Sequence, residues 1–295
     1  MKNDYVIHLR SFEGGLEIAN SQGIVSPAYT ILRSKQPCAP LFFDSYFHTD
    51  EFINHVLYKA VEGIRDGRQI SYEAFKWLSI PYCSLEEQTK IAEFLEKINL
   101  RIEKQRTLVE HLKKYKRGAS DKIFSEADGW DHVAFLDVFS TVPDKPYQVT
   151  TSEYYDSGIY EVVDQGKNDI VGYNNDESKV FNAIPIIVYG DHTTIIKYRN
   201  TPFIVGGDGV KLLTTKTNNN LQYLYYALCQ YNIQPEGYKR HFSIVKHLYI
   251  PIPSLEKQQI IAETLATLDM KIQKESCLLE SLLMQKKAFV QQLFM

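Results

Sequence analysis

The sequence predicts an α+β protein in which two mixed α/β domains, the first of them incomplete, are separated by two long helices that pair with each other. Three observations support this prediction. Residues 80–124 recur as residues 250–294 without a gap, which indicates a pseudo-twofold tandem repeat. Each copy spaces its apolar residues by alternating steps of four and three, as paired helices do. The region between the copies alternates short apolar runs with Gly, Asp and Asn, as strands joined by turns do.

The composition is that of a folded protein of more than one domain. The 295 residues are 44% hydrophobic and 23% charged, which excludes collagen-like and wholly disordered chains. No apolar run approaches the roughly 18 residues needed to span a bilayer, and the opening Met1–Asp4 does not resemble a signal peptide. Cys38, Cys83, Cys229 and Cys277 lie far apart, so neither a disulfide framework nor a zinc site is predicted. We therefore expect a cytoplasmic protein with free thiols.

Residues 1–79 are the first and shorter predicted domain. Tyr5-Val6-Ile7 predicts a strand similar to the one expected at residues 186–189. A stretch equivalent to residues from about 130 to 183 should precede that strand, and it is absent before Tyr5. We therefore expect the first domain to lack its front part. Its candidate cations are Arg10, Arg65 and Arg68.

The two copies of the repeat, residues 80–124 and 250–295, are predicted as long helices. They match at 17 of 45 aligned positions, far more than chance would give, so the chain contains a tandem duplication. Forty helical residues make a rod of about 60 Å. A domain of roughly a hundred residues cannot cover such a rod, so the expected partner of each helix is the other copy. Two helices that each pack only on their own domain are the alternative.

Both helices are expected to begin at the same local signal. Pro81 and Pro251 hold the preceding residue extended, and Ser84 and Ser254 each offer an N-cap oxygen. Glu87 completes a Ser-x-x-Glu capping box in the first copy, and the second copy has no acid at that position. Both helices should therefore start just after these serines.

Gln105 and Glu275 occupy equivalent positions in the two predicted apolar seams. A leucine there would be more stabilising, whereas a polar residue usually fixes the register of a helix pair. We consider two explanations. The two side chains specify the pairing of the helices, or both face solvent where the seam frays.

Residues 125–249 are predicted as a second mixed domain with segregated charge. Strands are expected over residues 130–138, 184–189 and 203–205, and a helix over 221–230. Residues 126–182 carry twelve acids against three lysines, whereas residues 183–249 carry seven bases against three acids. Exposed charge acts locally, because salt screens it beyond about 10 Å. The overall charge of −3 therefore does not exclude a surface for polyanions, although a solvated charge run is the alternative.

The candidates for nucleic-acid contacts are cationic, aromatic and hydroxyl side chains in predicted strand-end loops. The densest group lies in residues 238–243, a mixture typical of contacts to phosphates and base edges. The candidates in the second domain are His192, Thr193, Lys197, Arg199, Lys211, Tyr238, Lys239, Arg240, His241 and Ser243. Those in the first domain are Arg10, Ser11, Arg65 and Arg68.

No catalytic motif is convincing. The nucleotide-binding and methyl-donor fingerprints are missing, and so is the Asn/Asp-Pro-Pro-aromatic tetrapeptide of base methyltransferases. Asp144 with Glu177 and Lys179 loosely matches the pattern of a Mg²⁺-dependent nuclease, in which two carboxylates hold the metal. His192 has no nucleophile elbow beside it. We therefore expect no catalytic centre, no metal and no cofactor in this chain.

Several of these segments resemble one known family. The pattern Ile-Pro-x-x-Ser-Leu-Glu-x-Gln-x-x-Ile-Ala-Glu at residues 80–93, nearly repeated at 250–263, looks like the two central conserved regions of the DNA-specificity subunit of type I restriction-modification systems. Residues 10–15, 23–29 and 190–192 are similar to sequences in its target recognition domains. The resemblance covers essentially the whole chain.

The resemblance implies a non-catalytic subunit that recognises double-stranded DNA. Two target recognition domains would each read half of a split site in the major groove, and the helices, paired antiparallel, would set the distance between them. The same helices would dock methyltransferase subunits, which carry S-adenosylmethionine, and through them the restriction subunit. Cys83 in place of a proline, Asn99 opposite Asp269 of the second copy, and Lys257 in the capping position depart from the family pattern.

The missing front of the first domain leaves more than one function open. Complete reading of a bipartite site would need that segment from another polypeptide or from a second copy of the chain. Alternatively, the chain acts mainly as a protein-interaction or decoy module that occupies methyltransferase subunits. A Mg²⁺-dependent nuclease is a remote third hypothesis.

Overall fold

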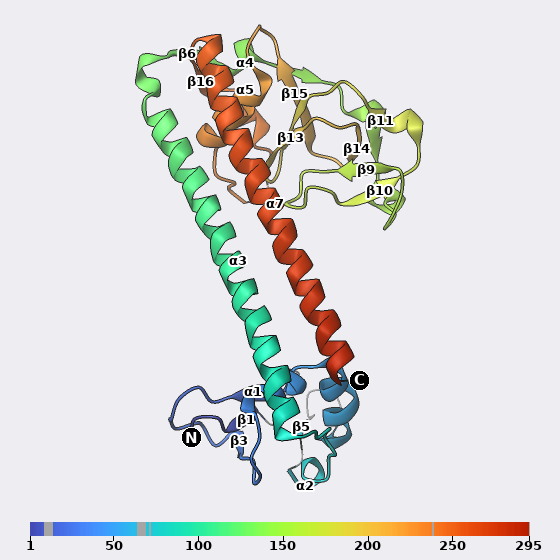
Figure 1. Cartoon of the computed structure of the whole chain (residues 1–295). Helices are drawn as coiled ribbons and strands as arrows, with labels where there is room; N and C mark the ends of the chain where they lie inside the picture. Colours follow the sequence, from blue (N-terminus) through green and yellow to red (C-terminus); the bar gives the residue numbers. More distant parts are fainter. Residues whose placement is uncertain (9–13, 64–68, 71, 238, 295) are drawn as a thin grey trace. The chain divides into compact units, whose positions relative to one another are not determined.

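The chain folds into two compact units in the computed structural model (Figure 1). Unit 1 contains residues 1–111 and 273–295, and unit 2 contains residues 112–272. Each long helix is divided between the units, because its two halves pack on different globular parts. The domains expected from the repeat follow the duplication instead: residues 1–79, 80–124, 125–249 and 250–295. The structure describes residues 1–8, 14–63, 69–70, 72–237 and 239–294.

Two long helices confirm the predicted rods. They are α3 (Leu85–Ser125) and α7 (Leu255–Phe294), of 41 and 40 residues. Ser84 Oγ accepts a hydrogen bond from the backbone N–H of Glu87 at 3.2 Å, and Ser254 Oγ accepts one from Lys257 at 3.4 Å. The N-cap therefore persists in the second copy without the acid of the capping box. No helix in the described ranges is long and apolar enough to cross a membrane.

In unit 1 the two helices pack against each other in antiparallel directions. Phe94, near the start of α3, contacts Phe289, near the end of α7, and Gln105 contacts Glu275. Gln105 Nε2 donates to the backbone carbonyl and to the carboxylate of Glu275, at 2.9 and 2.7 Å. The two polar seam residues therefore bind each other and do not simply face solvent. The buried apolar residues of this seam include Leu95, Ile102, Val109 and Leu282.

The globular part of unit 1 contains a three-stranded sheet formed by its first three strands, a separate pair formed by the next two strands, and short helices. Its strands are β1 (Tyr5–His8), β2 (Glu17–Ile18), β3 (Tyr29–Leu32), β4 (Val61–Glu62) and β5 (Gln69–Ile70). Its helices are α1 (Pro40–Phe47), a π-helix (Glu51–Val56), a 3-10 turn (Leu57–Ala60) and α2 (Tyr72–Phe75). The sheet order is β2-β1-β3, all antiparallel. Phe42, Tyr46 and Phe47 of α1 are buried against it, and Ala92 of α3 joins this core.

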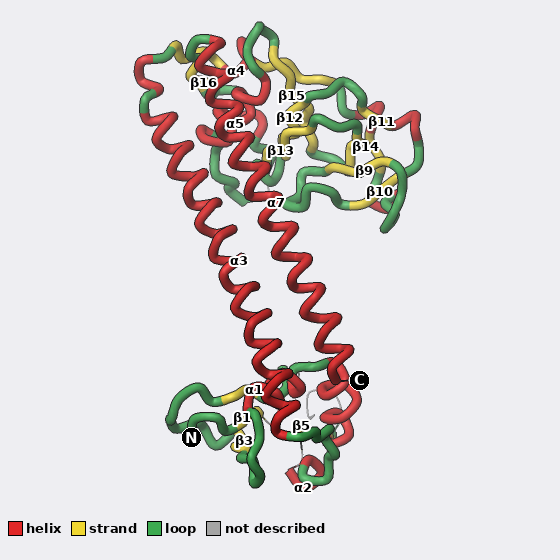
Figure 2. Tube along the Cα trace, viewed as in Figure 1, coloured by secondary structure: helices red, strands yellow, loops and turns green. Residues whose placement is uncertain are grey.

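Unit 2 contains two larger sheets and one antiparallel pair of strands that are far apart in the sequence (Figure 2). The four-stranded sheet, in the order β13-β12-β15-β7, contains β7 (Phe139–Val142), β12 (Ile186–Gly190), β13 (Ile196–Arg199) and β15 (Val210–Thr215). The five-stranded sheet contains β8 (Gln148–Val149), β9 (Tyr160–Val163), β10 (Gly172–Asn174), β11 (Val180–Phe181) and β14 (Phe203–Gly206). The remaining elements are β6 (Asp131–Ala134), which pairs with β16 (Tyr249–Ile252), and the helices α4 (Phe135–Val138), α5 (Leu221–Tyr231) and α6 (Phe242–Val245). The predicted strands at 184–189 and 203–205 and the helix at 221–230 are confirmed.

The strand predicted over residues 130–138 is wrong in its second half. β6 ends at Ala134, and the next four residues form the helical turn α4. In a helix, residues three apart share one face, whereas in a strand they point to opposite faces. The turn therefore buries both Phe135 and Val138, which are each 1% exposed. Burial of these two side chains overrides the alternating pattern.

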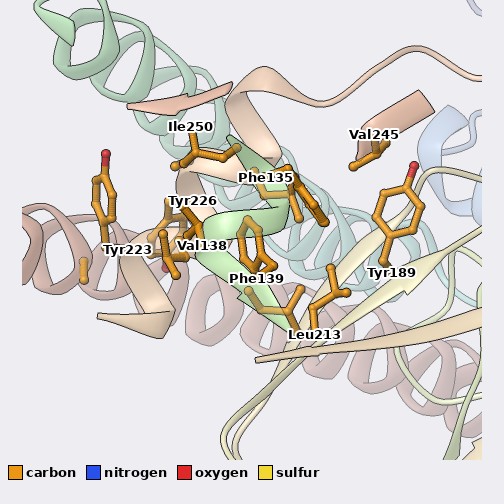
Figure 3. Close-up of a cluster of buried hydrophobic side chains, with 14 of the residues drawn as sticks. Phe135, Val138, Phe139, Tyr189, Leu213, Tyr223, Tyr226, Val245 and Ile250 are labelled. Carbon is orange, nitrogen blue, oxygen red and sulfur yellow. The ribbon is translucent and has the colours of Figure 1, made fainter. Parts of the chain in front are cut away.

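The core of unit 2 is centred on α4 and the start of β7 (Figure 3). Phe135 and Phe139 stack at a centroid distance of 4.6 Å. They belong to one cluster with Tyr189 of β12, Val245 of α6 and Ile250 of β16. Burying one such side chain stabilises a fold by roughly 1.5–3 kcal/mol. The segment 131–142 therefore holds together elements that are distant in sequence.

Both units attach their globular part to a long helix through a buried glutamine that the repeat makes identical. Gln88 Oε1 accepts from the backbone N–H of Ala39 at 3.1 Å, and Gln258 Oε1 accepts from Asn220 at 2.9 Å. Each Nε2 donates to a carbonyl five residues earlier in the chain. Ala39 precedes α1 and Asn220 precedes α5, so these two helices are structurally equivalent.

The sheets of the two units are equivalent as well. The order β2-β1-β3 corresponds to β13-β12-β15, and all these pairs are antiparallel. Tyr5 pairs with Leu32 as Ile187 pairs with Leu213. Unit 2 adds β7 at the free edge of β15. The duplication therefore extends beyond the helices into the globular parts.

Candidate nucleic-acid interface

Most of the predicted contact residues of unit 2 lie at one end of its four-stranded sheet. Three segments meet there: the β12–β13 connection at 191–195, the β14–β15 turn at 207–209, and residues 236–237 and 239–243 around the start of α6. Asp191 joins all three, because its N–H donates to the carbonyl of Gly209 at 2.7 Å and its own carbonyl accepts from the N–H of His241 at 2.7 Å. Its carboxylate accepts from the N–H of Phe242 at 2.8 Å. We call these three segments the loop cluster.

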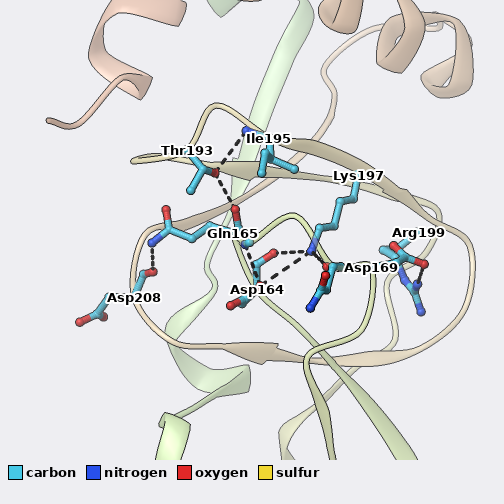
Figure 4. Close-up of polar contacts among 10 residues, drawn as sticks. Asp164, Gln165, Asp169, Thr193, Ile195, Lys197, Arg199 and Asp208 are labelled. Atoms are coloured by element: carbon cyan, nitrogen blue, oxygen red, sulfur yellow. Dashed lines mark hydrogen bonds and ion pairs between the residues drawn. The ribbon is translucent and has the colours of Figure 1, made fainter. Parts of the chain in front are cut away.

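Gln165, on the loop that follows β9, fixes the conformation of the β12–β13 connection (Figure 4). Its Oε1 accepts from the N–H of His192 at 3.0 Å, and its backbone carbonyl accepts from Thr193 Oγ1 at 2.5 Å. Its Nε2 donates to the carbonyl of Asp208 at 2.9 Å. A Cβ on Gly190 would lie 2.3 Å from Thr193 Oγ1, so only glycine fits there. The His192 backbone is therefore held in one position.

His241 is a structural residue in this arrangement. Its side chain is completely buried, and its Nε2 accepts from the N–H of Glu236 at 2.9 Å. Its Nδ1 lies 3.1 Å from the carbonyl of Asp191. Both ring nitrogens are thus occupied within the protein. His241 is among the candidates for contact with DNA, and its buried ring instead binds backbone groups of the protein.

Lys197 and Arg199 of β13 are likewise buried, each 7% exposed, and bind groups from the acidic half of the domain (Figure 4). Lys197 Nζ donates to the carbonyls of Asp164 and Asn168 at 2.9 and 2.5 Å. Burial lowers the pKa of Lys197, against the opposing effect of the Asp164 and Asp169 carboxylates. The lysine therefore ties β13 to the loop after β9 and is not presented to a phosphate.

Arg199 forms ion pairs with Glu161, and with Asp169 at 3.2 Å. Its guanidinium also lies 5.8 Å from the ring centroid of Phe203. The charge segregation seen along the sequence is thus partly cancelled in space, because acids of the first half neutralise bases of the second. The basic surface of unit 2 is smaller than the sequence count indicates.

Five of the predicted residues remain accessible on the loop cluster and its adjoining strand. Lys239, Arg240 and Ser243 are exposed, and His192 and Lys211 are half-buried. Lys239 shares its charge with Glu236 at 2.6 Å. We call these five residues the exposed polar face. Together they offer cations, an imidazole and a hydroxyl, which are donors suited to phosphate oxygens and base edges.

Of the other predicted residues, one has its hydroxyl bound within the protein, and five lie outside the residues that the structure describes. Thr193 is half-buried, and its hydroxyl is bound to Gln165. The predicted contacts Arg10, Ser11, Arg65, Arg68 and Tyr238 lie outside the described residues.

The acidic residues of the nuclease hypothesis lie on short turns. Asp144 precedes a 3-10 turn at Lys145–Tyr147, and Glu177 begins another at Glu177–Lys179. Within the described ranges, no group of three or more His, Cys, Asp or Glu side chains is arranged to hold a metal ion.

Comparison with known proteins places the chain. The family model of the type I restriction modification DNA specificity domain matches residues 127–283, which is just over half of the chain. The chain belongs to this family. Its matched part includes all of the loop cluster and Gln165.

Relatives of this specificity-domain chain include the Type I restriction enzyme EcoR124I/EcoR124II specificity subunit of Escherichia coli, with 31% identity over 86 residues. That match covers 28% of this chain and 21% of the relative, so it spans about a fifth of that protein's length. The S subunit of a type I restriction-modification system from M. genitalium has a similar structure, with a TM-score of 0.70 at 16% identity. The match covers 100% of this chain and 83% of that one.

A second solved structure, from a study of complex assembly and conformational transition of the type I R-M system, matches the specificity-domain chain with a TM-score of 0.56 at 15% identity. It covers 99% of this chain and 82% of that chain. At these identities the likeness concerns the fold, a mixed α/β architecture with two long helices, which agrees with the predicted fold class.

Sequence reasoning missed the residues that shape the specificity-domain loops. Gln165 and Asp191 bind mainly backbone groups. Asp191 lies within residues 190–192, which resemble the family's recognition domains, but that resemblance did not indicate its structural role, and no motif marks Gln165. Gln88 and Gln258 did carry a signal, since they are among the identities of the repeat. A polar residue kept in both copies next to an apolar seam indicates a buried hydrogen-bonding role.

Proposed function

We propose that this chain is a non-catalytic, sequence-specific DNA-recognition subunit of a type I restriction-modification complex. Unit 2 reads one half of a bipartite double-stranded site through the exposed polar face. The observation that carries this proposal is the placement of His192 and Arg240 on loops that a buried hydrogen-bond network holds rigid, with Lys211 at the start of the adjoining strand β15. A rigid set of donors loses little conformational entropy on binding, and so can discriminate between bases.

The proposal assigns the chemistry of the complex to its partners. Methyltransferase subunits dock along α3 and α7 and bring S-adenosylmethionine, and the restriction subunit joins through them. The chain itself holds no cofactor and carries out no reaction. The sequence contains no methyl-donor fingerprint, which leaves this chemistry to the partners.

DNA binding of the full chain with its methyltransferase subunit tests the proposal, with fluorescence anisotropy measured over a salt series. Arg240→Ala should weaken binding and reduce the slope of log K against log salt by about one for each phosphate that the variant no longer neutralises. Lys145→Ala is the matched control, because Lys145 is exposed on the acidic half of the same unit. Methylome sequencing of cells that co-express both subunits should reveal one bipartite modified motif. The proposal would be overturned if methylome sequencing showed no modified motif and the anisotropy of labelled DNA did not change when the complex was added.

One alternative has an observation in its favour. Among the described residues of unit 1, no strand pairs with residues 79–82 or with the outer edge of β3, unlike the equivalent positions of unit 2. A decoy that occupies methyltransferase subunits predicts their co-purification with the chain, without a modified motif. The same two measurements therefore separate the two functions.

A further inference from the structure

Unit 1 contains an apolar groove of about 420 Å³ beside its sheet. Charged and polar residues line one part of it, and its apolar wall includes Tyr5, Leu32, Phe43, Phe75, Ile80 and Tyr82. Ile80 is 40% exposed and Tyr82 is 58% exposed. Large apolar side chains gathered at one opening usually mark a site that another segment covers.

The equivalent positions of unit 2 show what such a segment looks like. The strand pairing, the two buried glutamines and the repeat map the groove residues onto Ile187, Leu213, Leu224, Val245, Ile250 and Ile252. All six belong to the cluster that packs around Phe135, Val138 and Phe139. The groove of unit 1 therefore corresponds to the space that β6, α4 and β7 fill in unit 2.

Two backbone edges of the groove match this assignment. In unit 2, β6 pairs with β16 and β7 pairs with β15, so one segment joins both strands. The equivalents in unit 1 are residues 79–82 and 31–34, and both line the groove. Among the described residues no strand pairs with residues 79–82, and none pairs with the outer edge of β3. Unpaired edges of this kind readily accept an added strand.

We propose that unit 1 binds a polypeptide segment from outside residues 1–295 with the pattern of residues 131–142: a four-residue strand, one helical turn that presents Phe-x-x-Val, and a second strand. A second copy of this chain is a poorer donor. Its own Phe135 is 1% exposed, and withdrawing the segment would open the core of its unit 2. Charge favours the pairing, because the segment carries Asp131 and Asp137 and no Lys or Arg, whereas Lys35 lines the groove. This inference does not depend on DNA binding.

A labelled peptide with the sequence of residues 130–143 tests the proposal by fluorescence anisotropy on the full chain. We expect saturable binding that weakens more than tenfold with Ile80→Asp in the protein. Ile159→Asp is the matched control, because Ile159 is 74% exposed in unit 2, and it should leave binding unchanged. A peptide with Phe135→Ala and Val138→Ala should also bind more than tenfold more weakly, which keeps the test valid if Ile80→Asp disturbs folding.

Two outcomes would overturn the proposal. One is the absence of saturable binding at peptide concentrations up to about 1 mM, the range of very weak complexes, or equal binding by all variants. The other is a stable dimer of the chain in sedimentation velocity that excludes the peptide. That result would assign the groove to a second copy instead.

Discussion

Ile80 and Ile250 occupy equivalent positions just before the long helices, yet Ile80 is 40% exposed and Ile250 is completely buried. The difference arises from β6, which pairs with β16 in unit 2 and has no counterpart against residues 79–82 in the described part of unit 1. The local signals around the two residues are similar, and each residue is followed by a helix with an N-cap serine. The comparison teaches that duplicated sequence reproduces local structure, whereas burial depends on which distant segments are present.

Alanine substitution at these two positions should break the equivalence most clearly. Ile250→Ala should lower the free energy of unfolding of unit 2 by about 2–5 kcal/mol, as expected for a fully buried isoleucine. Ile80→Ala should cost unit 1 less than about 1 kcal/mol, since much of its surface already faces water. Hydrogen exchange in a urea series measures each unit separately. Equal losses in the two units would show that Ile80 is covered in solution.

Substitution of the two buried glutamines should destabilise the two units by similar amounts, in contrast to the unequal effects expected at Ile80 and Ile250. Gln88→Leu and Gln258→Leu each leave a backbone N–H and a carbonyl without a partner, at a cost of about 1–3 kcal/mol. Gln273→Leu is the control, because Gln273 is exposed on α7. Hydrogen exchange of Ala39 and Asn220 should accelerate in the respective variants. A loss confined to one unit would contradict the shared role.

A smaller contrast lies between the helix pairs of the two units. Lys116 binds Asp269 at 2.5 Å in unit 2, whereas the equivalent residues of unit 1 are Lys286 and Asn99, which cannot form an ion pair because asparagine is uncharged. Asp269→Asn should reduce the free energy of unfolding of unit 2 by up to about 1 kcal/mol, the usual contribution of a partly exposed ion pair. Asn99→Asp should stabilise unit 1 by a similar or smaller amount. Calorimetry at low and high salt checks both, because salt should diminish each effect.

His48 should give unit 1 a pH dependence that unit 2 lacks. Burial opposes the charged ring, but the Asp44 carbonyl at 2.7 Å and the Glu17 carboxylate at 3.3 Å raise the pKa of His48 above its usual range. The protonated ring therefore stabilises unit 1 fully below about pH 6.5, and this contribution is lost as pH rises through the folded pKa.

The effect should stay below about 1 kcal/mol, because solvent screens a side chain that is 37% exposed. Thermal unfolding between pH 6 and 8 measures it, and His48→Gln should abolish the change in unit 1. The equivalent position of unit 2 holds Cys229, so unit 2 should show no matching change. A pH dependence that survives in His48→Gln would assign the effect to another group.

The candidate site was less predictable than the scaffold. The sequence showed that bases outnumber acids in residues 183–249. Of the candidates in this range, His192, Lys211 and Arg240 lie at the end of the four-stranded sheet where the loop cluster is. The sequence could not show that Lys197 and Arg199 point into the protein. Neighbouring residues in a strand face opposite sides, but which side is covered depends on a second sheet that is distant in sequence. A count of charges along the sequence does not show which of them form ion pairs in the folded protein.

The sequence by itself determined the two long helices and their capped starts, because an N-cap serine and a heptad spacing act over short distances, and it predicted their pairing without excluding separate packing. It also determined the strand at β12 and the helix α5. Only the tertiary structure decided that Phe135–Val138 is a helical turn, that Gln88 and Gln258 hold the globular parts, and that equivalent apolar residues are buried in unit 2 and open in unit 1. Those outcomes depend on contacts between segments far apart in the chain, and no local pattern records which segments meet.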